Sequence, residues 1–112
     1  MTNNQTEGER MREGHATPWG AAQTVREIVP GIENVTTAGH GGIHLDQAHA
    51  NKIPAEIVKA SWLGKANWWE EDCDWCVPFV IFEEEIKEKG DEHSKMVIKE
   101  GFHTDAYKRL TA

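Results

Sequence analysis

The feature that most constrains the fold of this chain is a change of residue pattern at Asp46. Before Asp46, short runs of β-branched residues alternate with Pro-Gly and Gly-rich turn signals, which are typical of strands. After Asp46, helix-forming Ala, Glu and Lys are frequent, and Asp46 is itself a common helix cap. Strands followed by helices define the α+β class. We expect a small antiparallel sheet over about residues 22–45, packed against three to four helices over residues 46–110.

Three short strands, with turns at residues 30–31 and 39–42, are the most economical interpretation of residues 22–45. A helix over Ala21–Ile28 is the alternative, because its Ala, Gln, Arg and Glu residues favour helix.

The length of 112 residues allows one domain. Residues 1–15 carry almost no large apolar side chain, so we expect a disordered N-terminal tail followed by a single domain over residues 16–112. No signal peptide and no apolar stretch of membrane-spanning length is visible, which predicts a soluble, cytoplasmic protein without a membrane partner.

Residues 70–82 allow two interpretations. The apolar stretch Trp75–Phe82 fits a buried strand, but the residue types favour a helix kinked at Pro78. On such a helix Glu70, Glu71, Asp74 and Glu85 would share one sector. A later helix, Ser94–Glu100, is expected to turn Met96 and Val97 inward.

The net charge of −7 is concentrated in residues 70–92, which hold ten acids and two lysines. The rest of the chain is nearly neutral, so no basic surface is available for direct nucleic-acid binding. The acidic segment is either a solvated face or a surface that a partner recognises.

Two clusters point to chemistry. His40 lies among glycines in Gly39–Gly42, where the backbone can approach a ligand or adopt positive φ, or where His40 merely shapes a turn. Glu70, Glu71 and Asp72 begin an acidic run that can act as a general base or bind a cation, or simply start a helix. We select His40, Glu70, Glu71 and Asp72 as the candidate catalytic residues. A separation above about 10 Å between His40 and these carboxylates would exclude a shared site.

Cys73 and Cys76 form a single CxxC pair, and His44 and His49 have a spacing allowed for zinc. The pair lies among Trp, Val and Phe, so we interpret the thiols as small buried side chains rather than as a zinc site or a redox pair. We therefore expect no cofactor and no structural zinc on Cys73, Cys76, His44 and His49.

Five tryptophans supply most of the large apolar surface. Trp68 and Trp69 are neighbours, and one of them is expected to face outward or line a groove. With the acidic sector they give the candidate binding residues Trp68, Trp69, Asp74 and Glu85.

Several blocks of this chain resemble an uncharacterised domain family of unknown function found in bacteria, bacteriophages and mobile elements. These blocks are Thr17–Gly20, Ile28–Ile32, Val35–Thr37, His40–Ile43 with Leu45, and Trp69–Cys73 with Trp75. The resemblance covers about residues 17–110 and implies a context rather than a mechanism. Its pattern includes His40 and Glu70–Asp72 but not His44, His49 or Cys76, which favours the first set as the site.

Two functional hypotheses follow. The first is a small phage- or mobile-element-type accessory protein that binds a host protein partner through an acidic helix within residues 70–92. The alternative is an enzyme or metal-dependent ligand-binding domain that uses His40 with Glu70, Glu71 and Asp72.

Overall fold

Two antiparallel sheets and six helices make up residues 11–111, the part of the chain that the computed structural model describes. The α+β class expected from the sequence is confirmed. The larger sheet has the strand order β3-β4-β5-β6, with β3 at Thr24–Val29, β4 at Ile32–Thr36, β5 at Gly41–Leu45 and β6 at Trp68–Glu70. A two-stranded ribbon of β1 (Ala16–Thr17) and β2 (Gly20–Ala21) precedes it.

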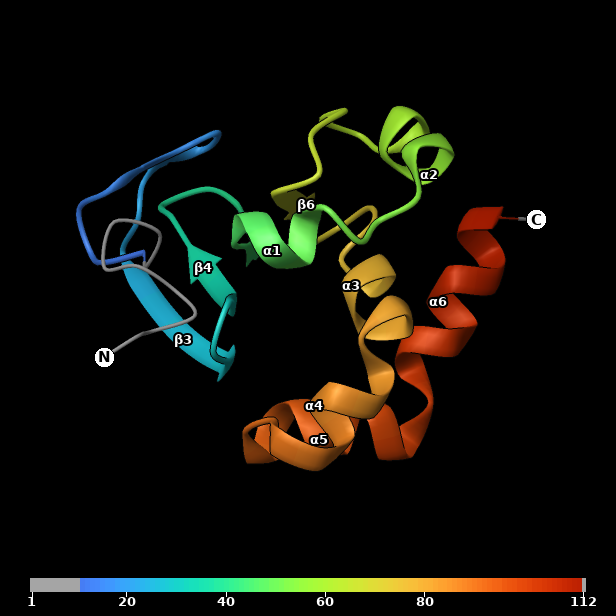
Figure 1. Cartoon of the computed structure of the whole chain (residues 1–112). Helices are drawn as coiled ribbons and strands as arrows, with labels where there is room; N and C mark the ends of the chain where they lie inside the picture. The colour runs from blue at the N-terminus through green and yellow to red at the C-terminus, as the bar shows by residue number, and fades with distance from the viewer. Residues whose placement is uncertain (1–10, 112) are drawn as a thin grey trace.

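The helices lie mainly on one side of the large sheet (Figure 1). Their bounds are α1 Gln47–Ala50, α2 Ala55–Ala60, α3 Cys76–Ile81, α4 Glu83–Lys89, α5 Glu92–Glu100 and α6 Phe102–Thr111. Helix α3 packs against α6, and α4 packs against both α5 and β3. Between residues 11 and 111, no helix combines the length and the apolar character needed to cross a membrane.

Strands β3, β4 and β5 form the antiparallel meander expected over residues 22–45. Pro30 and Gly31 make the first turn, where Gly31 has a φ of +94° that other residues rarely adopt. The alternative helix over Ala21–Ile28 is wrong, because Thr24–Val29 pairs with β4 along its length.

A fourth strand, β6, replaces the start of the expected kinked helix. The backbone of Trp68–Glu70 pairs with Gly42–His44 of β5, and Asp74 Oδ1 accepts a hydrogen bond of 2.8 Å from the Glu70 amide. A turn over residues 71–75 then leads into α3. The prediction that these four carboxylates share one sector of a helix is therefore wrong. Glu70 lies on a strand, Glu71 and Asp74 lie in a turn, and Glu85 lies on α4.

Pro78 does not kink a longer helix, because it is the third residue of α3. The first four amides of a helix have no intrahelical partner, so a proline there removes no hydrogen bond. Residues 76–81 are thus helical, as predicted, and do not form the alternative buried strand. The helix is short, however, and starts only after the acidic turn.

Two expected boundary residues of the other helices are confirmed, but the expected helix Ser94–Glu100 begins earlier, at Glu92, with Asp91 as its cap. Asp46 caps α1 by accepting a hydrogen bond from the His49 amide, and Gly101 ends α5 with a φ of +78°. Met96, however, is 60% exposed rather than turned inward, while Val97 is half-buried.

The expected tail of residues 1–15 falls partly outside the described residues. Within the described part, the Gly14 amide donates to the Ala22 carbonyl at 2.7 Å, and the Ala22 amide donates to the His15 carbonyl at 2.8 Å. The Met11 amide lies 3.3 Å from Glu33 Oε1. Residues 11–15 therefore contact the rest of the domain.

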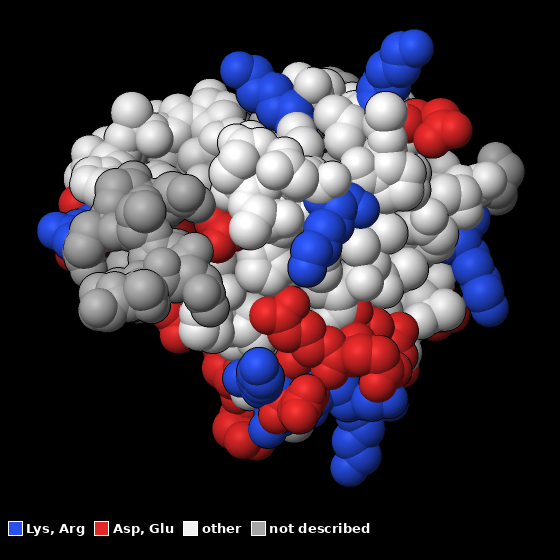
Figure 2. Space-filling view, in the orientation of Figure 1, with Lys and Arg blue, Asp and Glu red and all other residues white. Residues whose placement is uncertain are grey.

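One hydrophobic core joins the helical side of the sheet to the helices. Its members share near-complete burial, and they are Ile28, Val29, Ile32, Ile43, Leu45, Ala50, Ile53, Trp69, Val77, Phe79, Phe82, Ile86 and Ile98. Outside this core, acidic side chains gather over the region of α4 and α5, interspersed with lysines (Figure 2).

Candidate functional site: a histidine and two carboxylates at the edge of the sheet

A tight turn between β4 and β5 presents His40 to solvent. The Thr37 amide donates to the His40 carbonyl at 2.7 Å, and the His40 amide donates to Thr37 Oγ1 at 3.1 Å. Thr37 therefore closes the turn on both sides. The His40 side chain is 58% exposed, so its imidazole is held by its backbone but remains accessible.

Gly41 and Gly42, the two glycines that follow His40, serve close packing rather than positive φ. Positive φ occurs at glycines 14, 20, 31, 64 and 101, and at no non-glycine residue of the described chain. A Cβ on Gly41 would lie 2.7 Å from the Val35 carbonyl oxygen, and one on Gly42 would lie 2.7 Å from the Trp19 ring. Gly41 and Gly42 thus let β4, β5, β6 and Trp19 approach closely, which brings the end of β6 next to His40.

Glu70 meets His40 at this edge. The Glu70 side chain is only 6% exposed, and its Oε2 lies 3.5 Å from His40 Nδ1. Its other oxygen, Oε1, accepts a hydrogen bond of 2.8 Å from the Asp72 amide. One oxygen of Glu70 is therefore fixed by the backbone while the other faces the imidazole.

Asp72 completes a group of three possible ligands. One side-chain ligand atom from each of His40, Glu70 and Asp72 lies within 4.8 Å of the other two. Asp72 is exposed and lies two residues after Glu70, in the turn after β6. The structure thus brings together three of the four candidate catalytic residues, far inside the 10 Å limit.

Glu71 is separated from this group. Side chains alternate along a strand, and Glu70 pairs with Gly42 while Trp69 pairs with Ile43. The Glu71 amide donates to the Gly41 carbonyl at 2.9 Å, and its Oε1 lies over Gly41 on the face that carries Ile43. Glu71 therefore lines a pocket on the helical face of the sheet instead of joining His40.

Cys73 and Cys76 have different environments. Cys73 is exposed, and the pKa of its thiol is raised by partial burial, by a hydrogen bond to Glu70 and by the surrounding carboxylates. Cys76 is buried, which raises the pKa of its thiol to about 11. Both sulfurs therefore stay protonated near neutral pH, and a thiolate is the form that attacks electrophiles or binds metals.

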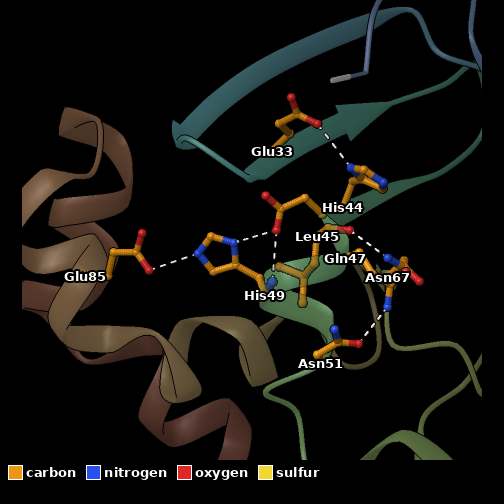
Figure 3. A network of polar contacts seen from close by, with 9 residues as sticks. Glu33, His44, Leu45, Gln47, His49, Asn51, Asn67 and Glu85 are labelled. Carbon is orange, nitrogen blue, oxygen red and sulfur yellow. Dashed lines mark hydrogen bonds and ion pairs between the residues drawn. The ribbon is translucent and has the colours of Figure 1, made fainter. Parts of the chain in front are cut away.

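His44 and His49, whose spacing in the sequence is allowed for zinc, each contact carboxylates (Figure 3). His44 Nδ1 lies 3.1 Å from Glu33 Oε1. His49 bridges two elements, with Nδ1 2.7 Å from Asp46 Oδ1 and Nε2 3.0 Å from Glu85 Oε1. Glu85, a candidate binding residue, thus links α4 to α1.

The other candidate binding residues lie at different depths. Trp69 is fully buried in the core, whereas Trp68 is half-buried, with its ring centroid 5.5 Å from that of Trp19. Asp74 is buried, and its two oxygens accept hydrogen bonds from the Trp62 and Glu70 amides, each at 2.8 Å. Burial is the main cause of the raised pKa of Asp74. These contacts give Asp74 a clear structural role.

Trp62 is the most exposed tryptophan, at 71%, and is not one of the candidate binding residues expected from the sequence. The sequence feature that indicates this exposure is the position of Trp62 just before the turn-forming Gly64 and the charged Lys65. Met96 and Phe102 were also missed as exposed apolar residues, because helical periodicity places Met96 next to inward positions.

Fold and site together define a small α+β domain with an imidazole and two carboxylates at one sheet edge. The chain belongs to a family described as a domain of unknown function (DUF7007), which matches residues 12–112. No curated protein matches this chain. No solved structure matches it either.

Proposed function

We propose that this domain binds a divalent metal ion through His40, Glu70 and Asp72 and uses that ion to hold an oxygen-containing ligand. The observation that carries the proposal is the convergence of one imidazole nitrogen and two carboxylate oxygens within 4.8 Å. They come from a turn, a strand end and the following turn, so the fold itself assembles them.

The donor set favours a first-row divalent ion. Imidazole suits Zn²⁺ and related ions, and carboxylates suit both these ions and Mn²⁺. Two ligand atoms of a tetrahedral zinc ion lie about 3.4 Å apart, given metal–ligand distances of about 2.1 Å. The distance of 3.5 Å between His40 Nδ1 and Glu70 Oε2 already fits that spacing. Asp72 is exposed, so a change of rotamer can bring its carboxylate closer.

The site also has an open side. Catalytic zinc sites typically have three protein ligands and leave further positions for water or substrate. His40 and Asp72 are exposed while Glu70 is buried, so a bound ion would have protein on one side and solvent on the other. An ion placed there can bind an oxygen ligand or lower the pKa of a bound water molecule.

The test is metal titration of the EDTA-treated protein with Zn²⁺ and with Mn²⁺ by isothermal titration calorimetry. We expect one ion per chain. The variants His40→Ala, Glu70→Gln and Asp72→Asn are each expected to weaken binding at least about tenfold, since even residues behind metal ligands have effects of that size. His93→Ala and Glu84→Gln are matched controls, because both residues are exposed and lie outside the site.

Circular dichroism of each variant separates lost ligation from lost folding. Binding that is unchanged in all three folded variants would contradict the proposal, as would the absence of stoichiometric binding in the folded wild type. Loss of binding in the control variants would show adsorption to surface histidines and carboxylates.

A second proposal concerns the acidic surface over α4 and α5. We propose that it binds a basic protein partner, as a phage- or mobile-element-type accessory protein would require. Its support is the local excess of acidic side chains in that region (Figure 2). Only α4, rather than the whole segment 70–92, supplies a strongly acidic helix.

The test is capture of protein from bacterial lysate at low and high salt. Capture is expected to fall with salt and with the double variant Glu84→Gln and Glu88→Gln. Capture that is insensitive to both changes would contradict a role for this surface.

A further inference from the structure

A pocket of about 450 Å³ lies between the helical face of the large sheet and helices α3, α5 and α6. Small-molecule sites commonly have volumes of roughly 300–1,000 Å³. The sheet wall of the pocket consists of the cross-strand neighbours Arg26, Asn34 and Ile43, together with the backbone of Gly42. Glu70 pairs with Gly42, one position along from Ile43, so its side chain points to the opposite face of the sheet. The pocket is therefore independent of the proposed metal site.

The wall of the pocket is aromatic and aliphatic. Its apolar side chains are Ile43, Trp75, Phe79, Met96, Val97 and Phe102. Trp75 and Phe79 pack edge to face with ring centroids 5.4 Å apart. Met96 and Phe102, at 60% and 57% exposure, are two of the most exposed large apolar residues of the described chain. Large apolar side chains that surround a concave surface favour a flat apolar ligand.

The two charged groups that line the pocket, Arg26 and Glu71, differ in their pairing with the described residues. Arg26 lines the pocket, but its guanidinium is paired with Asp91. The Glu71 side chain also lines the pocket and makes no hydrogen bond or ion pair with any residue between 11 and 111. A ligand that enters this pocket therefore meets a carboxylate at Glu71 that no side chain from the described part of the chain pairs with.

We propose that this pocket binds a small organic amine with a flat, apolar body. The ammonium group pairs with Glu71, and the apolar body packs among Trp75, Met96 and Phe102. A carboxylate accepts charge-assisted hydrogen bonds from an ammonium group, and the aromatic rings nearby also favour a cation. Amine and ring are thus recognised by different parts of the same pocket.

The experiment compares three indole probes of similar shape by ¹H–¹⁵N NMR in the presence of EDTA. Tryptamine carries an ammonium group, 3-ethylindole is neutral, and indole-3-propionate carries a carboxylate. We expect tryptamine to bind most tightly and indole-3-propionate most weakly. The amides of Glu71 and Phe102 and the indole signal of Trp75 are expected to shift on titration with tryptamine.

Glu71→Gln tests the carboxylate directly. It is expected to weaken tryptamine binding about tenfold or more, since a hydrogen bond to a charged group contributes about 1.5–3 kcal/mol, and to leave 3-ethylindole binding unchanged. Glu56→Gln is the matched control, because Glu56 is exposed on α2 and does not line the pocket; it is expected to change neither. Retained amide dispersion shows that each variant is folded.

Equal affinity for all three probes, or tryptamine binding that does not depend on Glu71, would overturn the proposal. No shift at the solubility limit of tryptamine would overturn it as well. If sedimentation shows a dimer that buries Met96 and Phe102, the face is an interface between copies and the proposal is wrong. His40→Ala is expected to keep tryptamine binding, so failure of the metal site and failure of this pocket are distinguishable.

Discussion

At the scale of single residues, Gly42 has the strictest steric requirement near the candidate site. A Cβ at this position would lie 2.7 Å from the Trp19 ring and closer still to the Trp69 carbonyl. We predict that Gly42→Ala lowers the free energy of unfolding by about 1–3 kcal/mol, because β6 or Trp19 must move to admit one methyl group. Urea unfolding followed by circular dichroism measures this loss.

Gly39→Ala is the matched control for that prediction. No atom lies within 4 Å of a Cβ built on Gly39, and its φ is not positive. Its stability is expected to stay within about 0.5 kcal/mol of the wild type. A Gly42 variant as stable as the Gly39 variant would show that the sheet edge has room to spare.

The pairing of His40 with Glu70 and Asp72 could be proposed from the sequence, because a histidine and adjacent acids are recognisable by residue type. The exclusion of Glu71 could not. Which of two neighbouring carboxylates meets His40 depends on the strand β6, and three residues, Trp68–Glu70, carry no periodic pattern. The exposure of the Trp62 indole could likewise not be predicted, because the residue type does not indicate whether a tryptophan is buried or exposed.

At the scale of elements, Asp91 joins α5 to the sheet. Its Oδ1 accepts a hydrogen bond of 2.9 Å from the Ser94 amide as the cap of α5, and its carboxylate pairs with Arg26 of β3. Its backbone amide donates to the Ile28 carbonyl at 3.0 Å. Burial alone would raise the pKa of Asp91, but the hydrogen bonds from Ser94 and Arg26 outweigh it and lower the pKa.

We predict that Asp91→Asn removes a pH-dependent part of the stability. Asn caps helices about as well as Asp, so the loss of about 1 kcal/mol near pH 7 reflects the partly exposed ion pair with Arg26. Because the folded pKa is lowered, this stabilisation is fully present above the ordinary pKa of 3.8 and is lost as the pH falls through the folded value.

Urea unfolding of wild type and variant between about pH 7 and pH 2 checks this sign. The two free energies are expected to converge at the acid end. A constant difference over the whole range would mean that the asparagine disturbs the cap itself.

Elements with strong local signals could be predicted, and the others could not. Asp46, Pro30-Gly31 and Gly101 mark boundaries by backbone chemistry that works without tertiary contacts. Strand β6 depends on pairing with β5, which is distant in sequence. The sequence allows Pro78 either to kink a long helix or to stand in the first turn of a short one. Only the residue at which the helix starts decides between these two positions.

At the scale of the whole molecule, both halves of the sequence contribute to one sheet and one core. Strand β6 follows two helices in the chain yet pairs with β5, and its Trp69 is fully buried against residues of both halves. We predict that residues 11–45 alone do not fold, because Ile28, Ile43 and Leu45 would lose their covering side chains. Amide dispersion in a ¹H–¹⁵N spectrum of that fragment measures this.

The matched comparison is residues 11–112, which keeps β6 and every helix. It is expected to give a dispersed spectrum like that of the full chain. A dispersed spectrum from residues 11–45 would show instead that the meander is stable without the helices.

The shortness of β6 also bears on how this domain can diverge. Glu70 and Glu71 are consecutive, but one points to the imidazole of His40 and the other lines the pocket on the helical face. If one residue were deleted between α2 and β6 and the strand slipped by one position, Glu71 would stand opposite Gly42 and Trp69 would turn out of the core. Point substitutions can therefore alter either face separately, whereas a single-codon change in the length of that connection alters both at once.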